Sequence, residues 1–153
     1  FMMFRVLLLS CLFAISAAAS AAERSPSPDG ATVGFANIAD GDVVPLMFTV
    51  RFSISGMGIA PAGTAIDNTG HHHLLIDVEE LPDMNQPLPA TDQILHFGGG
   101  QSETELTLDA GTHTLQLLLA DYRHVPHEPP VMSERITVTA SPDAPPRETE
   151  PED

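Results

Sequence analysis

A regular alternation of apolar and polar residues predicts that this chain is built from short β-strands. The clearest case is residues 46–54, where every second position holds a large apolar residue and Met, Thr, Arg and Ser stand between them. Successive side chains of a strand point to opposite faces. One face of this segment is therefore expected to join a core, and the other to meet solvent.

The same pattern predicts further strands, separated by turns rich in Gly, Pro and Asp. No helical period of useful length follows residue 22, and the chain has no internal repeat. These features predict an all-β fold, namely an immunoglobulin-like antiparallel β-sandwich of about seven strands over residues 31–140. The other predicted strands are residues 31–38, 71–78, 94–97, 103–108, 112–121 and 133–140.

The first 22 residues resemble a signal peptide. Arg5 precedes an apolar run, Val6 to Ala17, that is too short for a comfortable membrane span, and small residues follow it. We expect cleavage before Glu23, a periplasmic or secreted protein, and no stable membrane insertion after cleavage. A lipoprotein signal at Cys11 is the weaker alternative, because few apolar residues precede this cysteine.

Two polar segments flank the predicted domain. Residues 23–30 are rich in Pro and Ser, which is typical of a linker. Residues 141–153 contain no large apolar residue and several acidic ones. Such a segment cannot bury enough apolar surface to order itself, so we expect a disordered acidic tail.

Charge and cysteine content narrow the range of functions. The chain has 21 acidic residues against 6 arginines and no lysine, a net charge of −15, which becomes −16 once Arg5 is removed. Such a surface repels nucleic acid and anionic lipid, and it favours solubility or the attraction of cations. Cleavage would also remove Cys11, the only cysteine, which excludes disulfides and thiolate ligands.

The seven histidines all fall between His71 and His127. On a strand, His71 and His73 project to the same side, whereas His72 points toward the core. If strands 71–78 and 112–121 are antiparallel neighbours, the start of the first lies beside the end of the second. Imidazoles without thiolates favour Cu or Zn. The predicted metal ligands are His71, His73, His124 and His127, with Asp121 as a ligand or as an orienting partner.

Two other interpretations of these histidines stay open. They could form a hydrogen-bonded structural cluster with nearby carboxylates, or they could serve catalysis. No glycine pattern of a nucleophile elbow surrounds Ser133, and no GK[ST] follows Gly98–Gly100, so we predict no enzyme and no catalytic residue. The same pairing puts His113 near Asp77 at the opposite rim. His96 stands alone before the glycine run and receives no role.

Four segments of the chain are long and specific in their wording. They are PAGTAIDNTG (Pro61–Gly70), NTGHHHLLID (Asn68–Asp77), LHFGGGQSETELTL (Leu95–Leu108) and AGTHTLQLLLADYRHVPHEPPVMSERITV (Ala110–Val138). These segments resemble the bacterial family DUF4399, a domain of unknown function. The resemblance covers roughly residues 33–140, and it implies an exported, compact, mainly β domain that is often found alone behind a signal peptide. It implies no activity or cofactor, so it transfers no catalytic residue.

The sequence therefore predicts an exported β-sandwich module with a histidine-rich rim that binds Cu or Zn and catalyses no reaction. The alternative is a structural or interaction domain of the cell envelope that contacts another envelope protein and holds no metal. The two hypotheses differ in whether the histidine rings converge on one point or are scattered.

Overall fold

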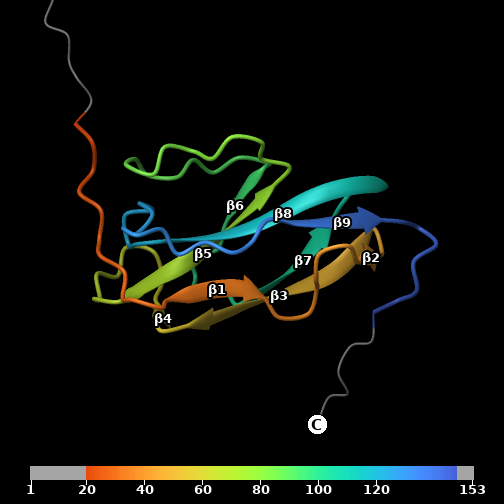
Figure 1. The fold of residues 1–153 in the computed structure, drawn as a ribbon, viewed down its shortest axis with the longest axis horizontal. Coiled ribbons are helices and arrows are strands. Elements are labelled where there is room, and N and C mark those ends of the chain that lie inside the picture. The colour runs from red at the N-terminus through yellow and green to blue at the C-terminus, as the bar shows by residue number, and fades with distance from the viewer. Residues whose placement is uncertain (1–19, 148–153) are drawn as a thin grey trace, which may run out of the picture.

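The computed structural model describes residues 20–147 as nine strands and no helix. The strands form two sheets that lie one above the other (Figure 1). The smaller sheet has the order β1-β3-β7, and the larger has the order β2-β9-β8-β5-β4, with β6 also paired to β5. The strands are β1 (Thr32–Phe35), β2 (Val43–Val44), β3 (Met47–Ser55), β4 (Gly58–Ile59), β5 (Thr69–Ile76), β6 (Ile94–His96), β7 (Glu103–Thr107), β8 (Gly111–Ala120) and β9 (Ile136–Ala140).

The main core lies between the two sheets. On β3, Phe48, Val50 and Phe52 are buried, while Met47 and Thr49 between them are exposed. These phenylalanines and this valine belong to one apolar cluster with residues of the larger sheet, including Leu74 of β5 and Leu117 of β8. The prediction of an all-β chain is confirmed, and the alternation that predicted it is the alternation that builds this core.

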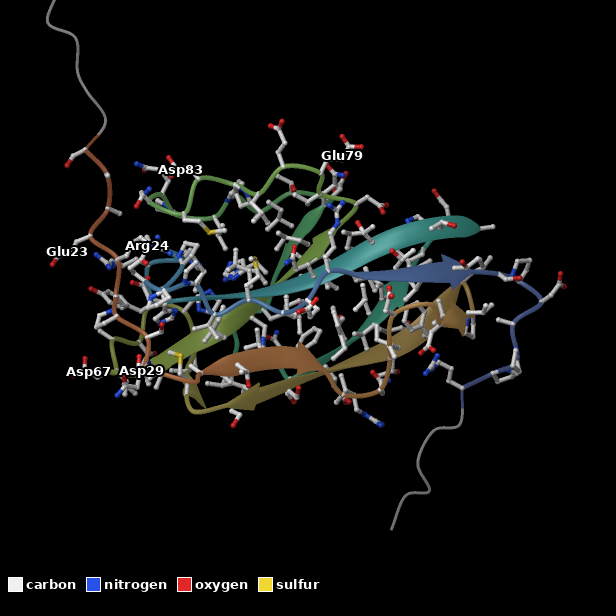
Figure 2. All side chains as sticks on the ribbon, in the orientation of Figure 1. Glu23, Arg24, Asp29, Asp67, Glu79 and Asp83 are labelled. Carbon is white, nitrogen blue, oxygen red and sulfur yellow. The ribbon has the colours of Figure 1, made fainter. Side chains whose placement is uncertain are left out.

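Strand β5 is buried on both faces, unlike β3. Its Leu74 faces the core between the sheets, whereas Leu75 joins a second apolar cluster on the outer face of the larger sheet. Leu88, from the long loop between β5 and β6, belongs to this second cluster. The loop runs over the outer face (Figure 1), and its Glu79 and Asp83 are exposed (Figure 2). The loop therefore encloses a second layer of buried side chains.

The predicted pairing of strands 71–78 and 112–121 is confirmed. Strands β5 and β8 are antiparallel, and His71 lies opposite Ala120. At the other end of the pair, His113 Nδ1 lies 2.7 Å from Asp77 Oδ2, as the pairing predicted. The short strands β2 and β4 were not predicted, because two residues are too few to show an alternation.

The segment expected to be a linker is attached to the domain. Residues 22–28, here called the N-terminal strap, lie at the end of the molecule where β8 ends, and Figure 2 labels Glu23 and Arg24 on it. Ser27 N donates to Glu128 O at 3.0 Å, and Arg24 donates to Pro126 O at 3.1 Å. A Pro/Ser-rich composition did not reveal these partners, which are about a hundred residues away.

The predicted signal peptide and acidic tail lie mostly outside the described residues. Of residues 141–153, those up to Arg147 are described, and the Arg147 guanidinium donates to Asn37 O at 2.6 Å. Cys11 and the apolar run before it fall outside residues 20–147.

Across residues 20–147 there is no helix long and apolar enough to cross a membrane.

Candidate metal centre

Two histidines of the site come from the start of β5. His71 and His73 are two residues apart, so their rings project to the same outer face of the larger sheet. Their side chains are 0 % and 1 % exposed. We expected this face to form an open rim, but the long loop and the turn after β8 enclose it. Both histidines are consequently buried.

A third histidine, His96, lies on the neighbouring strand. β6 pairs antiparallel with β5, and this register sets His96 directly opposite His73. Gly98, two residues after His96, is also constrained, because a Cβ at this position would lie 2.5 Å from His96 Nε2. Glycine at 98 therefore leaves the room that the His96 ring occupies.

The fourth histidine, His124, is carried by the turn that follows β8. Its backbone has φ of +67°, a left-handed conformation that is costly for a residue with a Cβ. The carboxylate of Asp121 holds the turn, because its Oδ1 accepts from the amides of Arg123 at 2.8 Å and Val125 at 3.2 Å. The carbonyl of His124 also accepts from Leu88 N at 2.8 Å. The turn thus directs the His124 ring at β5.

The four histidines converge on one point. One ligand nitrogen from each ring can be chosen so that all four lie within 4.8 Å of one another. In a tetrahedral Zn site with bonds of about 2.0–2.1 Å, all four nitrogens lie about 3.3 Å from one another. His71 Nε2 and His124 Nδ1 are 3.0 Å apart. These four residues are here called the four-histidine cluster. To surround a single Zn ion, their nitrogens would have to draw together from a spread of up to 4.8 Å, the longest separation shortening by about 1.5 Å.

The rings also pack against one another. Centroid distances between neighbouring rings run from 4.6 Å for His96 and His124 to 6.1 Å for His73 and His124. The His71 ring meets His124 edge to face, at 86°. This packing fixes the ring planes, so the nitrogens are oriented before any ligand binds.

Burial keeps the inner histidines uncharged. Loss of solvent, followed by repulsion from His124, lowers the pKa of His71 to about 4. Loss of solvent and the neighbouring histidines lower the pKa of His73 to about 3. Burial also lowers the pKa of His96 below its ordinary value. Neutral imidazole is the form that binds a metal, so protons do not compete for these nitrogens at pH 7.

Some nitrogens of the cluster have no hydrogen-bond partner. Within residues 20–147, Nδ1 of His71 and Nδ1 of His73 are buried and unpaired. Leaving a buried polar atom unpaired costs about 1–3 kcal/mol. Nδ1 of His72 and Nδ1 of His127, which lie outside the cluster, are also buried and unpaired, so this feature reflects burial and is not specific to the cluster.

Two of the predicted ligands are not members of the cluster. His127 is buried, but its Nε2 donates to Thr69 O at 3.1 Å, and its ring packs against Gly70. Asp121 accepts from Ser25 Oγ at 2.7 Å and from Arg123 Nη2 at 2.8 Å. Burial alone would raise the pKa of Asp121, but these hydrogen bonds outweigh it and lower the pKa. Asp121 is thus an ion-pair partner that shapes the turn.

The structure brings together His71, His73 and His124 of the predicted set and adds His96. The signal for His96 was its place just before a glycine run, where a short strand must turn back. Its register with His73 could not be derived, because seventeen residues of irregular loop separate β5 from β6. His72 points inward, as predicted, and its ring centroid lies 5.0 Å from that of Phe52.

The chain was compared with known proteins. The model of the family DUF4399, described as a domain of unknown function, matches residues 50–141, which is more than half of the chain. The chain belongs to this family. The DUF4399 match includes all four histidines of the cluster and the turn that carries His124. No curated protein and no solved structure matches the chain.

Proposed function

We propose that this DUF4399 domain is an exported, non-enzymatic module that binds one Cu(II) or Zn(II) ion through the four-histidine cluster. The observation that carries the proposal is the convergence of four ligand nitrogens within 4.8 Å. The lowered pKa values of His71, His73 and His96 support it, because these imidazoles are neutral and ready to bind at pH 7.

The donor set selects the ion. Four imidazole nitrogens suit late first-row divalent ions, whereas Mg²⁺ and Ca²⁺ prefer oxygen ligands. The cluster supplies nitrogen donors only. Cu(II) stands above Zn(II) in the Irving–Williams order, so we expect the tighter binding for Cu(II).

A second candidate function is a structural or interaction domain of the envelope without metal. Its support is the 3.0 Å contact between His71 Nε2 and His124 Nδ1, a hydrogen bond that stabilises the cluster by itself.

Metal titration of the untagged protein separates the two candidates. We expect one equivalent of Cu(II) or Zn(II) to bind, and His71→Ala with His73→Ala to abolish binding. His113→Gln is the matched control, since His113 lies on β8 with Asp77 as its partner. His127→Gln should also keep binding. Full binding by the double variant would reject the metal site, and the absence of binding in the wild type would favour the structural candidate.

The proposal includes an immunoglobulin-like sandwich in the periplasm. It is supported by a strand order in which β1-β3-β7 corresponds to A-B-E and β9-β8-β5 to G-F-C. Export is supported by the signal-like residues 1–22, and the net charge of −15 argues against nucleic acid as a partner. N-terminal sequencing of the protein from a periplasmic extract should start at Glu23. Recovery from the cytoplasm with Arg5 retained would contradict export.

A further inference from the structure

The four ligands of the proposed site differ in how they are held. His71 and His73 are 0 % and 1 % exposed, and His124 is half-buried on a turn with several hydrogen bonds. His96 is the exposed member of the cluster. An ion in the site would therefore be enclosed on the side of β5 and approachable on the side of β6.

His96 is also the ligand with the weakest attachment. It is the last residue of a strand of three residues, and β6 pairs with β5 alone among the described strands. Within residues 20–147, its ring nitrogens make no hydrogen bond, and its contacts are the rings of His71, His73 and His124. Rotation of this side chain toward solvent thus breaks no hydrogen bond among the described residues.

The remaining ligands cannot move in this way. His71 and His73 lie in a strand that is paired on both sides. The His124 turn is held by Asp121 and by the Leu88 amide. Three ligands are consequently fixed by the fold, and one is free to leave.

We infer that His96 is the exchangeable ligand through which the metal ion enters and leaves the site, so that the domain hands its ion to an acceptor. The inference rests on the proposed function. In the exchange step, the bond between the ion and a His96 nitrogen breaks as a donor atom of the acceptor binds the ion. No electron is transferred, and the imidazole leaves as its neutral form. The acceptor is a partner that carries metal-binding side chains of its own.

A chelator can stand for the acceptor. The protein is loaded with Zn(II), and the rate of zinc transfer to a colorimetric chelator is measured at several chelator concentrations. If an incoming ligand replaces His96, the rate for the wild type rises with chelator concentration. His96→Ala should transfer zinc at least about tenfold faster, since even changes outside the ligand shell alter metal affinity by about 10–100-fold.

Gly98→Ala offers a second variant that keeps all four histidines. The new Cβ would lie 2.4 Å from Cε1 of His96, so the ring must leave its place. We expect faster transfer in this variant, and the wild-type rate in His113→Gln. A rate that is independent of chelator concentration, or wild-type rates in both His96→Ala and Gly98→Ala, would overturn the role of His96. Failure of the wild type to load either ion would instead overturn the proposed function.

Discussion

The β5–β8 pair has histidines at each of its two ends, and the surroundings of the histidines differ between the ends. At one end, the four-histidine cluster is mostly buried and contains no carboxylate. At the other, His113 lies 2.7 Å from Asp77 and 2.8 Å from the Asp109 carbonyl. Burial alone would lower the pKa of His113, but these partners outweigh it and raise the pKa. The same residue type has a lowered pKa in the buried cluster and a raised pKa beside Asp77.

The difference shows that burial and partners, rather than the number of histidines, decide in which direction the pKa of each ring moves. Where desolvation dominates, the lone pair of the ring stays available. Where a carboxylate faces the ring, the protonated form is favoured.

Acidification should strongly destabilise the metal-free protein. The pKa values of His71 and His72 are lowered by burial to about 4, and that of His73 to about 3. The unfolded chain binds these protons near pH 6.5, so the free energy of unfolding must fall as the pH drops from 6.5 toward 4. Each histidine contributes on the order of 3 kcal/mol to this loss. Urea unfolding at a series of pH values measures this loss. If the free energy of unfolding did not change with pH, the histidines would not be buried in their neutral form.

Replacement of Asp121 should loosen the turn that carries His124. In Asp121→Asn, an amide group replaces an oxygen that accepts from Ser25 and Arg123. We expect a loss of about 2–3 kcal/mol in the free energy of unfolding, since a buried hydrogen bond to a charged group is broken. Ser25→Ala, which removes one of the donors, should cost less. If both variants melt at the wild-type temperature, the carboxylate does not hold the turn.

Metal should stabilise the folded protein by linkage. With free Zn(II) at about 100 times the dissociation constant, the free energy of unfolding should rise by about 2.7 kcal/mol. The rise should persist in His113→Gln and vanish in His71→Ala with His73→Ala. Thermal unfolding with and without the ion measures it. An equal rise in the double variant would show binding elsewhere on the acidic surface.

Removal of His113 should have the smallest effect. Asp77 is 43 % exposed, so His113→Gln is expected to cost only about 0.5 kcal/mol. The sign of the pH dependence is opposite to that of the cluster, because the raised pKa of His113 gives stability that is lost as the pH rises above 6.5. The variant should lack this small decline between pH 6.5 and 8. If the free energy of unfolding declined by the same amount in the variant, a group other than His113 would cause the decline.

Much of the fold and part of the site were predictable from the sequence. The alternation in β3 and the pairing of β5 with β8 followed from the period of the apolar residues, and that pairing alone brought His71, His73 and His124 to one end. The burial of the site was not predictable, because the loop between β5 and β6 has no regular pattern. For the same reason, His96 could not be assigned to the cluster, and His127 could not be separated from it.

The N-terminal strap has a consequence for how the protein folds. Its hydrogen bonds join residues that are about a hundred positions apart, such as Ser25 with Asp121 and Arg24 with Pro126. Synthesis proceeds from the N-terminus, so the strap has no partner until the segment after β8 has been made. Contacts of such long sequence separation also form late, because loop-closure entropy is lost before they contribute. The strap and the His124 turn should therefore become protected from hydrogen exchange after the β5–β8 pair.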